Sequence, residues 1–128
     1  MTTTEPDGRL CILVVEDEVF VRMTTVDMLE ELGHETIEAD TGQAALAALQ
    51  STPRIDLMLT DVGLPDIRGP ELAHTCRGLR PKLPIIFATG YDGDSIVQEF
   101  GDPAGTHVLP KPFQLDDLEQ ALRAIIGR

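Results

Sequence analysis

Acidic, hydroxyl and amino side chains stand at the ends of four short apolar runs of the chain. Glu16-Asp17-Glu18 follows the run at 10–15, Asp61 follows the run at 55–60, Thr89 ends the run at 84–89, and Lys111 follows the run at 106–109. Carboxylates held about 4 Å apart repel each other by about 4 kcal/mol at an effective dielectric of about 20. A cluster of them must therefore stay wet, take up protons or bind a cation, and Mg2+ is the natural choice because it prefers oxygen ligands.

These residue types suit phosphoryl transfer. Asp17 and Asp61 are suitable direct ligands for Mg2+, whereas the longer Glu16 can act through water. The Lys111 ammonium and the Thr89 hydroxyl can bind two oxygens of a phosphoryl group. Asp61 can be the nucleophile, since carboxylates form aspartyl phosphates. Each residue alone is more often a solvated loop, a turn or an ordinary strand end, so the signal lies in their combination.

Five strands that alternate with five helices would bring these side chains together. Branched and apolar runs predict strands near 10–15, 36–39, 55–60, 84–89 and 106–109. Periodic or capped stretches predict helices near 19–32, 41–50, 69–80, 94–100 and 115–125. The alternation predicts an α/β fold with right-handed crossovers and a doubly wound parallel sheet. In such sheets, sites form at the carboxyl ends of the strands, where the strand order reverses.

Local signals support two of these helices. The first should bury one apolar face, because four apolar residues recur at three-residue spacing: Met23, Val26, Leu29 and Leu32. Thr41 is placed to cap the second helix.

Length, composition and charge narrow the class of protein. The 128 residues predict one domain, and 10 basic against 22 acidic residues give a net charge of −12. That charge argues against nucleic acid or an anionic membrane as a direct partner. The chain has no apolar run long enough to span a membrane and no secretion signal, so we expect a cytoplasmic protein without membrane insertion. Residues 1–8 are expected to be a disordered lead-in to a domain at 9–128, and Cys11 and Cys76 to be buried free thiols.

Four stretches resemble the receiver domain of two-component response regulators, over roughly residues 9–127. They are Ile12-Leu13-Val14-Val15-Glu16-Asp17-Glu18, Leu59-Thr60-Asp61-Val62-Gly63-Leu64-Pro65, Phe87-Ala88-Thr89-Gly90-Tyr91 and Lys111-Pro112-Phe113. The resemblance implies a flavodoxin-like three-layer sandwich with strand order 2-1-3-4-5.

The resemblance also implies a role for each matching position. Asp61 is then the phosphoacceptor, and Glu16 and Asp17 are the acidic pair that holds Mg2+. The backbone carbonyl of Gly63 is a further metal ligand. Thr89 is the switch hydroxyl and Lys111 the phosphate-binding lysine. The residue after this lysine, Pro112, matches a proline that often follows a cis bond.

The sequence departs from the family pattern at one informative position. Many receivers carry a tyrosine or phenylalanine three residues before the lysine, where this chain has Val108. In those receivers the ring rotates as the switch hydroxyl moves. With a valine at this position, a movement of Thr89 cannot reach the outer face through such a ring, and Tyr91 is a candidate substitute. Phe87-Ala88-Thr89-Gly90 resembles a subset of stand-alone receivers, and Gly69-Pro70-Glu71-Leu72 resembles receivers attached to hybrid kinases.

The function expected from the resemblance is that of a phosphorylation-switched signalling protein. A histidine kinase or histidine phosphotransfer protein would phosphorylate Asp61, and the chain would catalyse only its own phosphorylation and dephosphorylation. Because no output domain is expected after residue 128, it would signal by binding a downstream protein or by passing the phosphoryl group onward. The fourth and fifth helices with the fifth strand are the expected output surface, and a monomer or weak dimer is the expected state.

Other interpretations remain open from the sequence. A receiver cut from a hybrid histidine kinase would look similar. A phosphatase with an aspartyl nucleophile would need an acid two residues after Asp61, where Gly63 stands. A flavin-binding electron carrier would need a phosphate loop after the first strand, where the acids would repel phosphate. The three histidines, His34, His74 and His107, are expected to be ordinary packing or surface residues.

Overall fold

The computed structural model describes residues 8–90, 93–102 and 104–126. Strands and helices alternate as predicted: β1 (Cys11–Val15), α1 (Val19–Glu31), β2 (Glu35–Ala39), α2 (Gly42–Ser51), β3 (Leu57–Asp61), α3 (Gly69–Leu79), β4 (Ile85–Thr89), α4 (Gly93–Phe100), β5 (Thr106–Pro110) and α5 (Leu115–Ile126). The predicted lead-in falls, apart from Gly8, outside the described residues. None of the described helices is long and apolar enough to cross a membrane.

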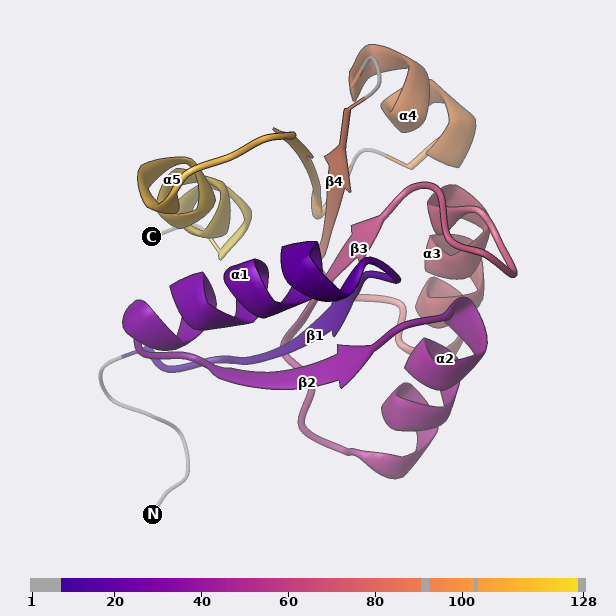
Figure 1. The fold of residues 1–128 in the computed structure, drawn as a ribbon. Helices are drawn as coiled ribbons and strands as arrows, with labels where there is room; N and C mark the ends of the chain where they lie inside the picture. The colour runs from indigo at the N-terminus through magenta and orange to yellow at the C-terminus, as the bar shows by residue number, and fades with distance from the viewer. Residues whose placement is uncertain (1–7, 91–92, 103, 127–128) are drawn as a thin grey trace.

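The five strands form one parallel sheet in the order β2-β1-β3-β4-β5. Helices α1 and α5 cover one face of the sheet, and α2, α3 and α4 lie on the other (Figure 1). The order reverses between β1 and β3, which are neighbours at the centre of the sheet and pair Val15 with Thr60 at their carboxyl ends. The predicted fold class and strand order are therefore confirmed, and the chain segments after β1 and β3 meet at one edge.

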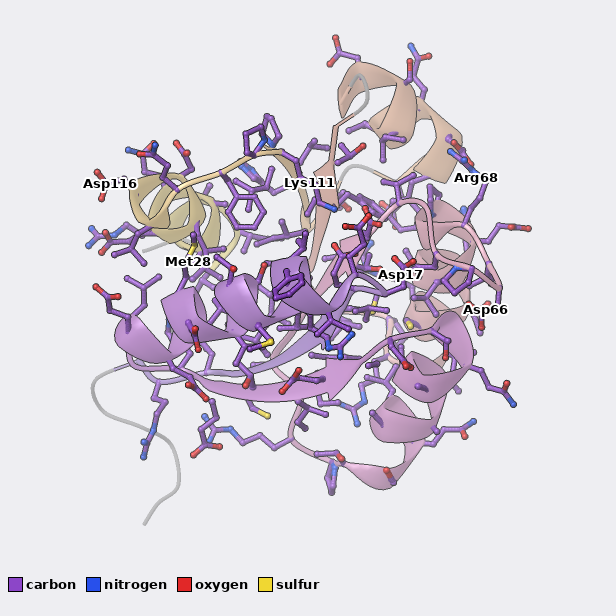
Figure 2. All side chains as sticks on the ribbon, viewed as in Figure 1. Asp17, Met28, Asp66, Arg68, Lys111 and Asp116 are labelled. Carbon is purple, nitrogen blue, oxygen red and sulfur yellow. The ribbon has the colours of Figure 1, made fainter. Side chains whose placement is uncertain are left out.

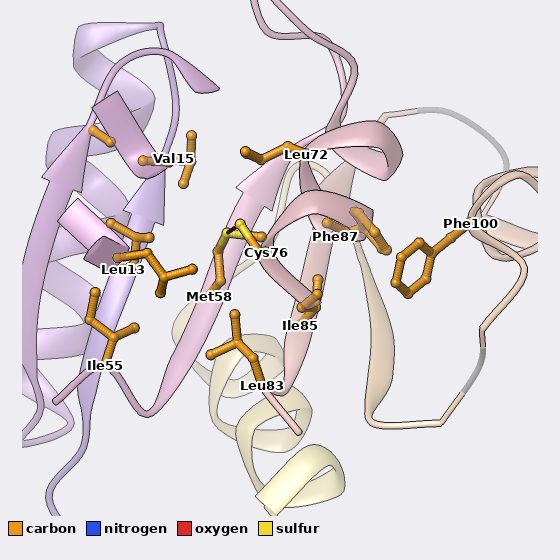
Figure 3. Close-up of a cluster of buried hydrophobic side chains, with 14 of the residues drawn as sticks. Leu13, Val15, Ile55, Met58, Leu72, Cys76, Leu83, Ile85, Phe87 and Phe100 are labelled. Carbon is orange, nitrogen blue, oxygen red and sulfur yellow. Dashed lines mark hydrogen bonds between the residues drawn. The ribbon is translucent and has the colours of Figure 1, made fainter. Parts of the chain in front are cut away.

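Two hydrophobic clusters fill the space between the sheet and its helices. Successive side chains of a strand point to opposite faces, so Leu13 and Val15 join the cluster under α2, α3 and α4, whereas Ile12 and Val14 join that under α1 and α5. Figure 3 shows the first cluster, where the Cys76 sulfur lies 3.8 Å from that of Met58.

Both cysteines are buried free thiols, as predicted. Burial raises the pKa of Cys76 to about 11, so its thiol stays protonated and unreactive at neutral pH.

The predicted apolar face of α1 is wrong at its first residue. Val26 and Leu29 are buried, but Met23 is 52% exposed, and the nearby Phe20 is 83% exposed. A spacing of three falls short of the helical turn of about 3.6 residues, so each step rotates about 60° around the axis. Over three steps, from Met23 to Leu32, the series turns through about half a circle and cannot stay on one face. The first turns of α1 therefore present apolar side chains to solvent.

The predicted start of β3 is also corrected by the structure. Ile55 is buried, but the strand begins at Leu57. Between them, the Asp56 carboxylate accepts the Cys11 N–H at 2.8 Å, so a side chain, rather than a neighbouring strand, binds the first N–H of β1. The ends of the other elements agree with the sequence to within one residue.

Candidate functional site

The structure brings the predicted acidic residues together at the carboxyl edge of the sheet. Glu16 and Asp17 follow β1, and Asp61 is the last residue of β3. One carboxylate oxygen from each of the three lies within 4.8 Å of the others. Figure 2 shows Asp17 and Lys111, which come from opposite ends of the sequence, at this same edge. The fold therefore gathers the three carboxylates into one cluster.

Lys111 binds two of these carboxylates at once. Its Nζ donates to Glu16 Oε1 at 2.9 Å and to Asp61 Oδ1 at 3.1 Å. Burial by itself lowers the pKa of Lys111, but the hydrogen bonds and charges of the two carboxylates outweigh burial and raise it above its ordinary value. The side chain is therefore a firmly charged ammonium, and it offsets part of the repulsion within the cluster.

Glu16 is the buried member of the cluster, with a side chain only 5% exposed. Its second oxygen, Oε2, accepts the backbone N–H of Glu18 at 3.1 Å. Burial raises the pKa of Glu16, and the hydrogen bond from Lys111 opposes that rise. A buried carboxylate needs a compensating cation, so Glu16 depends on Lys111 in the absence of a metal.

The main chain fixes Thr89 and Lys111 side by side. The Lys111 N–H donates to the Thr89 carbonyl at 2.8 Å, which extends the pairing of β4 and β5 by one residue. Thr89 is 1% exposed and ends β4, one residue after Ala88, which pairs with Asp61 on the neighbouring strand β3. The Lys111-Pro112 bond is cis, as the resemblance predicted.

The loop after Asp61 folds back tightly against the strand. Gly63 pairs with Arg68 across the loop, and the Gly69 N–H donates to the Val62 carbonyl at 2.8 Å. A Cβ on Gly69 would lie 2.6 Å from the Asp61 carbonyl oxygen, so only glycine fits there. Gly63 is exposed and its Cβ position is open. Gly63 stands two residues after Asp61, and its role as a main-chain ligand stays a prediction.

Two side chains anchor this loop to neighbouring helices. Asp66 accepts the backbone N–H groups of Gly42 and Gln43 at 2.9 Å each, at the start of α2. Arg68 donates to both carboxylate oxygens of Glu99 in α4, at 2.7 and 2.8 Å. In Figure 2, Arg68 lies on the side of the loop toward α4 and Asp66 on the side toward α2. Neither contact can be recognised from the sequence, because both partners are distant along the chain.

The donor set fits a hard divalent cation. It consists of carboxylate oxygens, the ligands that Mg2+ prefers. Glu16 is buried, Asp61 is half-buried and Asp17 is exposed, so the cluster opens to solvent on one side. That opening suits an ion that keeps part of its water shell. The three acids carry three negative charges against the single positive charge of Lys111. The remaining negative charge would be offset by a bound cation.

An apolar groove adjoins the acidic cluster between α1 and the start of α5. Its volume is about 480 Å³, and it is lined by Phe20, Val21, Thr24, Thr25, Met28, Lys111, Pro112 and Phe113. Lys111 thus belongs both to the groove wall and to the acidic cluster. The exposed Val19, Phe20 and Met23 continue the apolar surface around the first turns of α1.

The other residues discussed from the sequence have packing roles. Val108 is half-buried in β5, and a Cβ on Gly93 would lie 2.9 Å from its Cγ1, so the valine packs closely against the start of α4. Tyr91, the candidate substitute for a ring there, lies outside the described residues. His34 Nδ1 accepts the Leu10 N–H at 3.1 Å, and the His74 ring packs 4.7 Å from that of Phe100, between centroids.

Sequence comparison gives the same family along most of the chain. The model of the response regulator receiver domain matches residues 12–123. The response regulator receiver protein CpdR of Brucella abortus is 34% identical over 115 residues, which cover 90% of this chain and 95% of CpdR. The sensor kinase CckA of the same species is 32% identical over 98% of this chain but only 13% of its own length.

The fold comparison agrees. The chemotaxis response regulator CheY4 of Vibrio cholerae superposes with a TM-score of 0.83 and 28% identity, over 92% of this chain and 99% of that one. These likenesses place the chain in two-component signal transduction and do not favour a phosphatase. The strand order, the acidic edge and the match over residues 12–123 lead to one conclusion: the chain belongs to the response regulator receiver domain family.

Proposed function

We propose that this receiver accepts a phosphoryl group on Asp61 from a phosphohistidine of a histidine kinase or histidine phosphotransfer protein. Mg2+ would be held by Glu16, Asp17, Asp61 and the carbonyl of Gly63. The observation that carries the proposal is the close grouping of three carboxylates, within 4.8 Å of one another, around a lysine that already binds two of them.

In the proposed reaction, an Asp61 carboxylate oxygen attacks the phosphorus atom of the donor. A phosphorus–oxygen bond forms and the phosphorus–nitrogen bond breaks. The donor ring, which carries a proton on its other nitrogen, takes the bonding electron pair and leaves as neutral imidazole. Bound Mg2+ supplies positive charge that offsets the repulsion between the phosphoryl oxygens and the carboxylates. Lys111 transfers one hydrogen bond from Asp61 to a phosphoryl oxygen, and Thr89 donates its hydroxyl to another. The charged state of Lys111 at neutral pH, favoured by its raised pKa, supports this role.

The phosphodonor protein would dock in the apolar groove beside α1. Lys111 lines this groove and also binds Asp61, so a protein that covers the groove reaches the acceptor. Phe20, which is 83% exposed, supplies apolar area for the contact. A patch of this kind next to a reactive group is a typical interaction site, and a phosphodonor is the partner that the reaction requires.

The output of the phosphorylated chain would be protein binding or onward transfer of the phosphoryl group, in the cytoplasm. Movement of the Thr89 and Lys111 side chains toward the phosphoryl group would favour a pre-existing active conformation. The net charge of −12 argues against direct binding to nucleic acid. In this proposal the chain catalyses only its own phosphorylation and dephosphorylation, as a monomer or weak dimer.

Intact-mass measurement after incubation with acetyl phosphate and Mg2+ tests the acceptor. We expect the mass of one added phosphoryl group in the wild type and none in Asp61→Asn or in excess EDTA. Asp66→Asn is the matched control, because Asp66 is an aspartate of the same loop that is not in the cluster. A full mass shift in Asp61→Asn would show that Asp61 is not the acceptor. A full mass shift in excess EDTA would show that phosphorylation does not require a metal ion.

A further inference from the structure

One arginine outside the acidic cluster contacts the main chain that carries it. Arg22 lies one turn into α1, and its Nη1 donates to the Glu16 backbone carbonyl at 2.8 Å. Its Nε donates to Glu38 Oε1 at 3.0 Å, on the edge strand β2. The Arg22 side chain is only 17% exposed. The guanidinium thus forms a fork between the end of β1 and the end of β2.

The carbonyl that Arg22 binds belongs to the peptide unit that joins Glu16 to Asp17. This unit is planar, so a hydrogen bond to its oxygen fixes the plane and with it the direction in which both residues leave the backbone. On the other side, the Glu16 N–H donates to the Ala39 carbonyl at 2.9 Å. Two of the three carboxylates of the cluster are therefore oriented through a main chain that Arg22 holds.

We propose that Arg22 is a positioning residue for the cation site, which it orients through the Glu16–Asp17 peptide unit without touching the ion. The rigid guanidinium suits this role because it can donate to a carbonyl and to a carboxylate at once. Glu38 holds the fork in place and balances its charge, so the pair adds little positive potential against the ion. This inference rests on the proposed magnesium site and adds to it a residue that the carboxylates themselves do not reveal.

Electrostatics and positioning predict opposite results for removal of Arg22. Arg22→Met deletes a positive charge close to a cation site and leaves Glu38 unpaired, so electrostatics alone predicts tighter binding of Mg2+. Positioning predicts weaker binding by about tenfold, the lower end of the range for loss of a partner that orients metal ligands. The direction of the change therefore separates the two.

The test is a titration of the metal-free chain with Mg2+ alone, followed by the amide signals in two-dimensional NMR. Arg54→Met is the matched control: Arg54 also binds one carboxylate, that of Asp56 at 3.1 Å, and one backbone carbonyl, that of Arg9 at 2.7 Å. We expect a dissociation constant about tenfold higher in Arg22→Met and unchanged in Arg54→Met. The Asp17 amide signal should also shift before Mg2+ is added, in Arg22→Met only.

Unchanged or tighter binding in Arg22→Met would overturn the inference, because a merely structural arginine would lower thermal stability without altering the ion's affinity. If Arg22→Met does not fold, Arg22→Lys decides, since it keeps the charge but lacks the planar guanidinium whose two separate nitrogens reach the Glu16 carbonyl and Glu38. Weaker Mg2+ binding in Arg22→Lys supports the inference, and wild-type affinity refutes it. Failure of the wild type itself to bind Mg2+ would instead overturn the proposed metal site.

Discussion

Replacement of Lys111 by methionine is the sharpest perturbation of the acidic cluster. The substitution removes the hydrogen bonds to Glu16 at 2.9 Å and to Asp61 at 3.1 Å but keeps most of the side-chain volume. Breaking a fully buried pair costs about 3–5 kcal/mol, because it leaves an uncompensated charge. Lys111 is 23% exposed and Asp61 16%, so solvent screens part of the loss. We expect destabilisation of about 2 kcal/mol in metal-free buffer at neutral pH.

The loss should depend on pH through Glu16. The pKa of this carboxyl is already raised by burial above 4.5, and without Lys111 it loses the hydrogen bond that opposes the rise. A carboxyl whose pKa is raised in the folded state costs stability, and the cost sets in as the pH rises above its unfolded pKa and is complete above the raised one. The deficit of Lys111→Met should therefore be small below pH 4.5 and grow above it. The wild-type advantage should disappear again well above 10.5, as Lys111 itself loses its proton.

Urea unfolding in EDTA at about pH 4 and about pH 8 measures this dependence. Mg2+ gives an independent check at neutral pH: the cluster changes from a net charge of −2 to −3, so added Mg2+ should stabilise the variant more than the wild type. Lys82→Met controls for loss of a charge, since Lys82 is the only other lysine of the chain and is exposed. Equal deficits at both pH values, or equal stabilisation by Mg2+, would refute the electrostatic account.

Three further predictions concern the surroundings of the cluster. Gly69→Ala should lower the free energy of unfolding by about 1–3 kcal/mol in urea, because the new Cβ would lie 2.6 Å from the Asp61 carbonyl oxygen. Gly63→Ala should be nearly neutral in the same measurement, and equal costs would contradict the packing argument. Phe100→Ala should cost about 3 kcal/mol, since the ring is 2% exposed and anchors α4; a loss below about 1 kcal/mol would show that α4 is not anchored there. Asp66→Ala should lower the melting temperature at neutral pH. Backbone hydrogen bonds lower the pKa of Asp66 from 3.8, so this deficit should shrink as the pH falls below 3.8 and vanish once the pH lies below the lowered pKa; a deficit that persists at that pH would argue against capping.

The fold and the acidic edge could be predicted because they depend on local patterns. Short apolar runs that end in acids, hydroxyls and an amine are visible in the sequence, and parallel topology makes their ends converge. The contacts of Arg22 and Asp66 could not be predicted in this way. Each joins a side chain to a backbone group of another element, and any arginine or aspartate could do so. Sequence periodicity also failed for Met23, because a spacing of three imitates an amphipathic face only over a short stretch.

The double membership of Lys111, in the acidic cluster and in the wall of the groove, has a consequence for reaction rates. A protein seated in the groove displaces water from beside the ammonium and lowers the local dielectric constant, which strengthens its attraction for a phosphoryl oxygen. A small donor such as acetyl phosphate leaves that side hydrated. Contact with a macromolecular donor would therefore make the acceptor more reactive at the moment of encounter, and discrimination between donors would arise partly from solvent exclusion.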